Sequence, residues 1–341
     1  MSVLVIGDPH FQLSNLEEVR TFIDKLDTYL SEHEPAHIVV LGDILHDHER
    51  LHTTPLNIAS EWLISLAERA QTWAIVGNHD LINNSQFLTQ NHWMNALKQT
   101  DNLNIVDTAV ETCMGNRKIV LVPYVPPGRF EEALNQTDWK NADLIFAHQE
   151  FKGCHMGSIV SEDGDDWPDT NPPVISGHIH GKQTVGNVFY PGSALPVSFA
   201  ETGRRIILMI HANGDREEID LGLKQKKVIY TDADSIADVN PEDHPNRTLK
   251  ICIDTTKEKF KQVKKSAKFK SLQKAGVKIV FKRSKESIEL DNQQIQKHIG
   301  HTSKHAGDDA SGESTSFDAI LHRLVQESNE HVKQAYDIVT K

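Results

Sequence analysis

Residues 72–80 read Thr72-Trp73-Ala74-Ile75-Val76-Gly77-Asn78-His79-Asp80 and join an apolar run to a polar end. The β-branched and aromatic residues of this run predict a buried strand. Its last residues place polar side chains just after the strand, at the end where α/β sheets usually hold their ligands. A Gly-Asn pair alone is typical of an ordinary turn, so the meaning of the stretch depends on what accompanies it.

Other polar groups follow short apolar runs elsewhere in the chain. The runs cover residues 3–6, 37–41, 144–147 and 174–176, and the polar residues after them are Asp8, His10, Asp43, His148, His178 and His180. Taken singly, each group is as typical of a turn or a surface as of a ligand. Five such groups in one chain favour a single site shared by the ends of several strands.

The spacing of apolar residues alternates between strand and helix patterns. Residues 16–30 and 56–70 repeat apolar side chains at helical spacing, and residues 129–135 predict a further helix. More strands are predicted at residues 104–107, 118–124, 187–190 and 205–210, whereas the acidic, proline-rich residues 158–173 predict a surface loop. Continuous apolar strands between helices indicate sheets covered on both faces. We therefore expect an α/β fold, a four-layer α/β/β/α sandwich, over residues 1–222.

The 341 residues leave room for one large domain and a smaller one. No run approaches the roughly 18 consecutive apolar residues of a membrane span, and Asp8 interrupts the first apolar run before a signal-peptide core forms. Cys113, Cys154 and Cys252 are far apart and predict reduced core residues. We expect an intracellular, cytoplasmic protein with no membrane partner.

Charge is divided unevenly along the chain. The net charge is −12, but residues 257–285 hold 12 of the 36 basic residues against one acidic residue. Strands are predicted at residues 248–253 and 277–281, with a lysine-rich helical stretch at 257–275 between them. We expect a small α+β cap domain over residues 223–300 that docks on the first domain. Residues 301–316 predict a flexible linker, and residues 317–341 an amphipathic helix.

The polar groups after the strands offer only oxygen and imidazole nitrogen as ligands: Asp8, His10, Asp43, Asn78, His148, His178 and His180. Such a set suits Mn, Fe or Zn rather than copper or an iron–sulfur cluster. Seven ligands exceed the needs of one ion, and Asp43 has two oxygens that can bridge, so we expect two divalent ions. A pair of ions about 3.5–4 Å apart is the usual machinery of phosphate-ester hydrolysis. His79 is the candidate to protonate the leaving oxygen or to stabilise developing charge.

The series as a whole resembles the calcineurin-like metallophosphoesterase superfamily. The motifs that carry the resemblance are Asp8-Pro9-His10, Gly42-Asp43, Gly77-Asn78-His79-Asp80, His148 and Gly177-His178-Ile179-His180. The resemblance covers residues 1–222. It implies that one ion is held by Asp8, His10, Asp43 and His180, and the other by Asp43, Asn78, His148 and His178.

A narrower resemblance follows the last histidines. Tyr190-Pro191-Gly192-Ser193 and Ser198-Phe199-Ala200-Glu201 are similar to a segment of SbcD-like nucleases, the double-strand-break repair family that includes the meiotic recombination nuclease eleven. Gly42-Asp43-Ile44-Leu45-His46 resembles that family's second motif, which makes His46 a further catalytic candidate. The Pro-Gly-Ser turn offers N–H groups that can receive a DNA phosphate at Ser193, although a purely structural turn fits equally well.

SbcD-like nucleases also carry a cap domain and a helical segment that binds a coiled-coil ATPase. By this resemblance the lysine-rich unit is the cap, with Lys261, Lys264, Lys265 and Lys268 as DNA contacts. Residues 317–341 would bind an SbcC-like ATPase. The sequence leaves two alternatives open, a solvated helix face for the lysines and packing on the chain's own core for the last helix.

The resemblance implies a DNA exonuclease and endonuclease subunit that uses two Mn²⁺ ions in recombination or repair, with DNA, the ATPase and a second copy of the chain as partners. The chain is compact for this family, which suits a bacterial or viral member. Two alternatives remain. Another calcineurin-like phosphodiesterase or phosphatase, acting on a small molecule or a phosphoprotein, would give no reason for the cap lysines. A non-catalytic scaffold of the same fold would have lost part of the ligand set, which is complete here.

Overall fold

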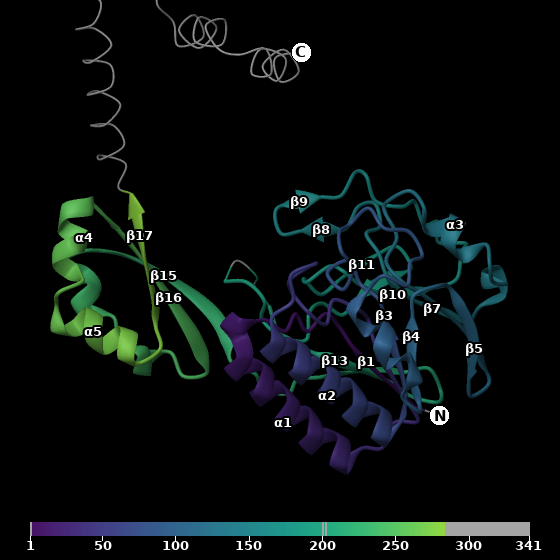
Figure 1. Cartoon of the computed structure of the whole chain (residues 1–341). Coiled ribbons are helices and arrows are strands. Elements are labelled where there is room, and N and C mark those ends of the chain that lie inside the picture. Colours follow the sequence, from purple (N-terminus) through teal and green to yellow (C-terminus); the bar gives the residue numbers. More distant parts are fainter. Residues whose placement is uncertain (1, 200, 202, 284–341) are drawn as a thin grey trace, which may run out of the picture. The chain divides into compact units, whose positions relative to one another are not determined.

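The computed structural model describes residues 2–199, 201 and 203–283 (Figure 1). The linker expected at residues 301–316, the helix expected at 317–341 and the last part of the expected cap lie outside the described residues. Within the described residues, two six-stranded sheets occupy the N-terminal two thirds of the chain and a three-stranded sheet follows them.

The first sheet is built mainly from parallel strands. Its order is β14-β13-β1-β2-β3-β4, where β1 (Val3–Ile6), β2 (His37–Val40), β3 (Gln71–Ile75) and β4 (Leu103–Val106) run parallel. The strands β13 (Ile207–Ile210) and β14 (Arg216–Ile219) add antiparallel at the β1 edge. The end of each parallel strand therefore lies at one edge of the sheet.

The second sheet has the order β11-β12-β10-β7-β6-β5. Its centre is parallel and consists of β6 (Arg117–Val122), β7 (Leu144–His148), β10 (Val174–Gly177) and β12 (Val188–Tyr190). Antiparallel strands β5 (Val110–Met114) and β11 (Gln183–Val185) close its two sides.

The two sheets pack face to face between two outer layers. Helices α1 (Leu16–Glu32) and α2 (Thr53–Arg69) cover the first sheet, where Phe22 and Trp62 join a core with Leu4. Helix α3 (Phe130–Leu134) belongs to the core on the outer side of the second sheet. A third core, with Val39 and Phe146, lies between the sheets. The expected four-layer α/β/β/α sandwich is confirmed.

Shorter elements connect these layers. They are the 3₁₀ helices η1 (Leu13–Asn15), η2 (Trp93–Gln99) and η3 (Trp139–Asn141) and the paired strands β8 (His155–Met156) and β9 (Ile159–Val160). The segment expected to be only a surface loop therefore contains a strand, β9. Cys113 is exposed rather than part of the core, because it occupies an outward position of edge strand β5.

Residues 225–283 form their own sheet and core. The sheet order is β15-β16-β17, with β15 (Gln225–Asp232), β16 (Arg247–Thr255) and β17 (Lys278–Arg283). Ile251 and Ile253 pack with Phe269 and Leu272. The 3₁₀ helices η4 (Ser235–Asp238) and η5 (Pro241–Asp243) lie between β15 and β16. The sequence did not predict β15, because this segment has only two aliphatic residues, Val228 and Ile229, with charged residues on either side of them.

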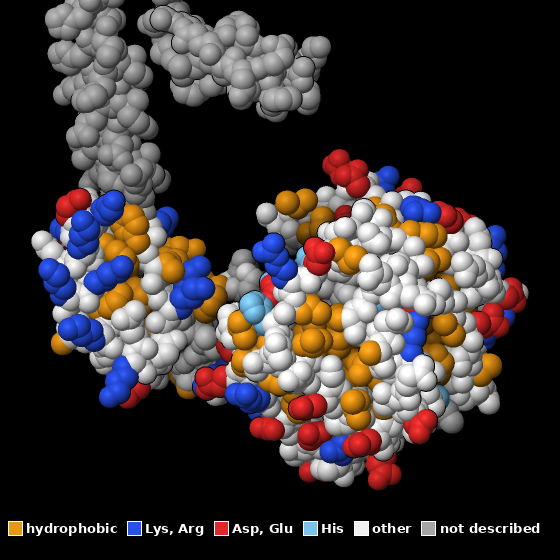
Figure 2. All heavy atoms as spheres, viewed as in Figure 1, with side chains coloured by type: hydrophobic (Ala, Val, Ile, Leu, Met, Phe, Trp, Pro, Cys, Tyr) orange, Lys and Arg blue, Asp and Glu red, His pale blue; other side chains and the backbone are white. Residues whose placement is uncertain are grey.

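The lysine-rich stretch forms two short helices, α4 (Lys257–Val263) and α5 (Ala267–Lys274). Their division follows from capping: the side chain of Thr256 accepts a hydrogen bond from the N–H of Lys259, and that of Ser266 from Phe269. Lys and Arg side chains are prominent on this part of the surface in Figure 2. Over the described residues, no helix combines the length and apolar character that crossing a membrane requires.

Candidate metal centre

The carboxyl ends of five parallel strands carry all seven predicted ligands. Asp8 and His10 follow β1, Asp43 follows β2, Asn78 follows β3, His148 ends β7, and His178 and His180 follow β10. Two sheets that pack face to face bring these ends together. Five of the side chains are buried, while His178 and His180 are partly exposed and form an open side.

Three of the ligands have an uncommon backbone conformation. The φ angle is 47° at His10, 49° at Asp43 and 78° at His178. Side chains other than glycine rarely adopt positive φ values, and such strain tends to collect at functional sites. Neighbouring glycines allow the close approach. A Cβ atom on Gly177 would lie 2.5 Å from Asp8 Oδ1, so only glycine fits beside that carboxylate.

One ligand group consists of Asp8, His10 and His180. Their potential ligand atoms all lie within 4.8 Å of one another, and Nε2 of His10 is 2.8 Å from Nε2 of His180. The Oδ1 atom of Asp8 is buried and has no hydrogen-bond partner. A buried carboxylate oxygen without a partner is costly, and a cation shared with the two imidazoles would remove that cost.

The second ligand group consists of Asp43, His148 and His178, again with ligand atoms within 4.8 Å of one another. The side-chain oxygen of Asn78 joins it, 3.0 Å from Nε2 of His148 and 2.9 Å from Nδ1 of His178. Each of these atoms offers a lone pair when the imidazoles are neutral, so the four converge as one cation site.

Asp43 joins the two groups. Its Oδ2 atom lies 3.6 Å from Nε2 of His10 in the first group and 3.4 Å from Nε2 of His148 in the second. Its Oδ1 atom accepts a hydrogen bond of 2.8 Å from the backbone N–H of His79. One oxygen is thus fixed by the chain, and the other is placed where a bridging ligand belongs.

The electrostatics favour positive charge in this pocket. Burial lowers the pKa of His148, but the Asp43 and Asp8 carboxylates outweigh it and raise the pKa to about 9. Burial likewise raises the pKa of Asp43, yet His148 and its hydrogen bond hold the pKa well below the usual range. The buried carboxylates therefore attract a cation, and divalent ions would take the place of the proton on His148 because ligand histidines bind in neutral form.

The residues present fit two divalent ions. When bound, such ions neutralise phosphate charge and make water a better nucleophile. The protein's contribution is the arrangement of its own atoms: seven candidate oxygen and nitrogen ligands, the Asp43 carboxylate close to both groups, and a buried Asp8 oxygen without a hydrogen-bond partner.

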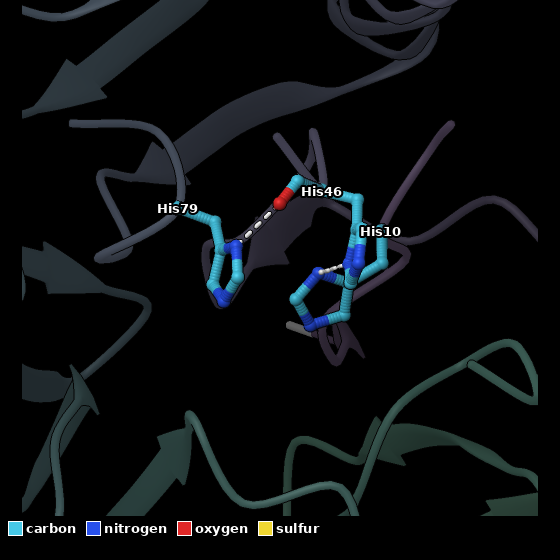
Figure 3. Close-up of side chains that lie close together, drawn as sticks. All are labelled: His10, His46 and His79. Atoms are coloured by element: carbon cyan, nitrogen blue, oxygen red, sulfur yellow. Dashed lines mark hydrogen bonds between the residues drawn. The ribbon is translucent and has the colours of Figure 1, made fainter. Parts of the chain in front are cut away.

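His79 lies beside the ligands without belonging to either group. Its Nδ1 atom is 2.5 Å from the carbonyl oxygen of His46 (Figure 3). The His79 ring also stacks on His48, with centroids 4.4 Å apart. Because a carbonyl oxygen only accepts, Nδ1 carries the hydrogen, which leaves Nε2 for substrate. This geometry suits proton transfer to a leaving oxygen.

His46 contacts both a ligand and the proposed acid. Its Nδ1 atom is 3.4 Å from Nδ1 of His10, and its carbonyl oxygen holds His79 (Figure 3). Burial, followed by the neighbouring His79, lowers the pKa of His46. His10, His46 and His79 also place one ligand atom each within 4.8 Å of the others. The structure therefore brings both predicted catalytic histidines to the site.

Asp80, for which the sequence suggested no role, holds two of the motifs together. Its Oδ1 atom accepts hydrogen bonds from the N–H of Ile44 (3.2 Å) and from Nε1 of Trp93 (2.8 Å), and its Oδ2 atom accepts one from Gly77 (3.0 Å). Burial and then Asp43 raise the pKa of Asp80 to about 6. The residue was visible in the Gly-Asn-His-Asp motif, but only the folded chain shows that it links the Asp43 and Asn78 loops.

Of the predicted DNA contacts, Ser193 lies beside the ligand residue His180, whereas the four lysines belong to the lysine-rich stretch. Ser193 is fully buried; its hydroxyl accepts a hydrogen bond from Arg205 (2.9 Å) and its N–H donates to His180 (3.2 Å). Neither group is therefore left open to a phosphate in this structure. Lys261, Lys264 and Lys265 are exposed on or after α4, and Lys268 is partly exposed on α5.

A sandwich with two converging ligand groups defines the class of two-metal phosphoester hydrolases. The calcineurin-like phosphoesterase family profile matches residues 1–191, more than half of the chain. The chain belongs to the calcineurin-like phosphoesterase family, whose members use divalent metals to hydrolyse phosphate esters. This confirms the broader of the two resemblances.

Two viral proteins are similar over most of the chain. The phosphoesterase-named protein 078R of Invertebrate iridescent virus 3 is 40% identical over 292 residues, which cover 83% of this chain and 84% of that protein. The phosphoesterase-named protein 244L of Invertebrate iridescent virus 6 is 43% identical over 277 residues, which cover 77% of this chain and 97% of that protein. Among solved structures, the E. coli phosphoesterase YfcE covers 65% of this chain and all of its own at 11% identity, with a TM-score of 0.33.

Proposed function

We propose that this phosphoesterase is a DNA nuclease subunit, an SbcD-like enzyme that cleaves phosphodiester bonds with exonuclease and endonuclease activity. The main support is that one chain carries both the candidate two-ion site and a lysine-rich unit. Residues 257–285 carry 12 basic side chains and one acidic one, against 24 basic and 47 acidic in the rest of the chain. Lysines concentrated in one part of an otherwise acidic protein create a local positive potential, which favours binding of a polyanion such as DNA.

The residues have distinct roles in this proposal. The seven candidate ligands would hold two divalent ions, Mn²⁺ in this proposal, and the ions would neutralise and orient the phosphate. His79, with Nδ1–H held by the carbonyl of His46, would donate the Nε2 proton of its imidazolium form to the leaving 3′ or 5′ oxygen and become neutral. Lys261, Lys264, Lys265 and Lys268 would contact backbone phosphates, which gives affinity without sequence preference.

The partners belong to the same proposal. An SbcC-like coiled-coil ATPase would bind through residues 317–341, which lie outside the described residues. A second copy of the chain is the other proposed partner. The support for both is the resemblance of the 190–201 segment and of the domain order to SbcD-like nucleases.

Cleavage of labelled linear DNA in the presence of Mn²⁺, compared with hydrolysis of bis(p-nitrophenyl) phosphate, tests the proposal. We expect both substrates to be cleaved. A Lys264→Glu, Lys265→Glu double variant should bind DNA more weakly and lower the salt dependence of binding by about two counterions. Its hydrolysis of the small ester should be unchanged, because the lysines carry no ligand.

The control is Lys140→Glu, which reverses one exposed lysine outside the lysine-rich unit. It should leave both activities as they are. Hydrolysis of the small ester without cleavage of DNA, also after addition of the ATPase, would contradict the nuclease proposal and favour a small-molecule phosphodiesterase. Absence of any hydrolysis would favour a non-catalytic protein of this fold.

A further inference from the structure

The ligand histidine His180 has a carboxylate behind it. Its Nε2 atom faces His10, whereas its Nδ1 atom lies 2.9 Å from Oε1 of Glu201. A carboxylate accepts from Nδ1–H and so leaves the lone pair of Nε2 directed at the ion. The Glu201 side chain is only 15% exposed, so solvent competes little for this contact.

Arg205 holds Glu201 in place. Its Nη2 atom donates to Oε2 of Glu201 at 2.9 Å, and its Nη1 atom donates to the carbonyl oxygen of His180 at 2.6 Å. The backbone N–H of Val197 donates to the same Oε2 atom at 3.1 Å. The Arg205 side chain is 3% exposed. One buried guanidinium thus fixes both the carboxylate and the backbone of the histidine that the carboxylate supports.

The other ligand histidines have different outer partners. Nδ1 of His148 donates to the carbonyl of Leu41 at 2.7 Å, and Nδ1 of His10 lies 3.4 Å from Nδ1 of His46. Nε2 of His178 is 3.9 Å from Glu150, beyond hydrogen-bond distance. Asp43 approaches His148 from the ligand side, but among these four histidines, all within the described residues, only His180 has a carboxylate at hydrogen-bond distance from the ring nitrogen that faces away from the ligand group. The support is therefore specific to the first ligand group.

We propose that Glu201, clamped by Arg205, is a positioning residue that orients His180 and sets the affinity of the first metal site without contacting substrate. The second site, built on Asn78, His148 and His178, does not depend on it. The affinity of the first metal site can thus change while the affinity of the second stays the same. The inference rests on the two-ion site and not on DNA as the substrate.

Glu201→Gln tests this role, because glutamine keeps the size of the side chain and loses its charge. Mn²⁺ binding to the metal-depleted full-length protein is followed by electron paramagnetic resonance of the free ion. We expect one of two binding events to weaken about 10- to 100-fold, while the other keeps its affinity. Hydrolysis of bis(p-nitrophenyl) phosphate should recover at high Mn²⁺.

Glu218→Gln is the matched control: this exposed carboxylate pairs with Lys182, and within the described part of the chain it makes no ion pair with a ligand histidine, so both binding events should be unchanged. The proposal would be overturned if Glu201→Gln bound both Mn²⁺ ions with wild-type affinity. It would also be overturned if both affinities fell equally, because that would indicate a general structural role. Metal-free thermal unfolding of Glu201→Gln verifies that the variant is folded, and Glu201→Asp replaces it if it is not. Failure of the wild-type chain to bind two ions would instead overturn the two-ion site.

Discussion

Replacing Asp43 with asparagine is expected to abolish phosphoester hydrolysis and to reduce the number of bound ions from two to one or none. The Oδ2 atom of Asp43 lies within 3.6 Å of a ligand nitrogen in each group. The amide keeps an oxygen to accept the N–H of His79, but an amide nitrogen has no lone pair for a metal ion. The fold should therefore remain while the bridge is lost. Hydrolysis of bis(p-nitrophenyl) phosphate and the Mn²⁺ count per chain are the measurements.

Asp47→Asn is the control for this change. Asp47 lies four residues further along the chain, its side chain is 46% exposed, and its nearest basic group is Nε2 of His52 at 3.9 Å. It should retain hydrolysis and both ions. Retention of two ions and of hydrolysis by Asp43→Asn would show that the carboxylate does not bridge.

The second large effect is expected for His79→Ala, with kcat about 10²- to 10⁴-fold lower and the ion count still two. His79 is half-buried beside the ligands but belongs to neither ion's set. If it donates a proton, the loss should be larger for DNA, whose leaving alkoxide is a strong base, than for a nitrophenyl ester, whose leaving group needs little protonation. Turnover of both substrates by wild type and variant gives the comparison.

His52→Ala is the matched control, because the His52 side chain is 54% exposed and lies outside the centre. It should hydrolyse both substrates at wild-type rates. Loss of a bound ion in His79→Ala would show that His79 is a ligand. An equal loss for the two leaving groups would contradict proton donation and favour stabilisation of phosphate charge instead.

The sequence predicted the sandwich, and it predicted that the candidate ligands come together, because both depend on local features. Short apolar runs mark the strands, and each ligand follows such a run directly, as Asp8 follows β1 and His148 ends β7. Parallel strands place these ends at one edge. The positions of the apolar runs and of the polar residues after them were therefore enough to predict that His10 and His180, 170 residues apart in the sequence, share a site.

The supporting contacts were not predictable in the same way. Glu201 and Arg205 act through His180, and Asp80 acts through backbone N–H groups of another loop, so their roles depend on folded distances. The proposed phosphate contact at Ser193 depended on groups whose partners are visible only in three dimensions. Strand β15 was not predicted, because its few apolar residues stand next to lysines and do not form a clear strand pattern.

The two-ion centre is tested most directly by measuring the number of bound ions and the hydrolytic activity together. Metal-depleted protein is titrated with Mn²⁺ while the free ion and the hydrolysis of bis(p-nitrophenyl) phosphate are measured together. We expect two ions per chain and hydrolysis that rises only as the second ion binds. One ion per chain, or hydrolysis by the fully depleted protein, would contradict the two-ion centre.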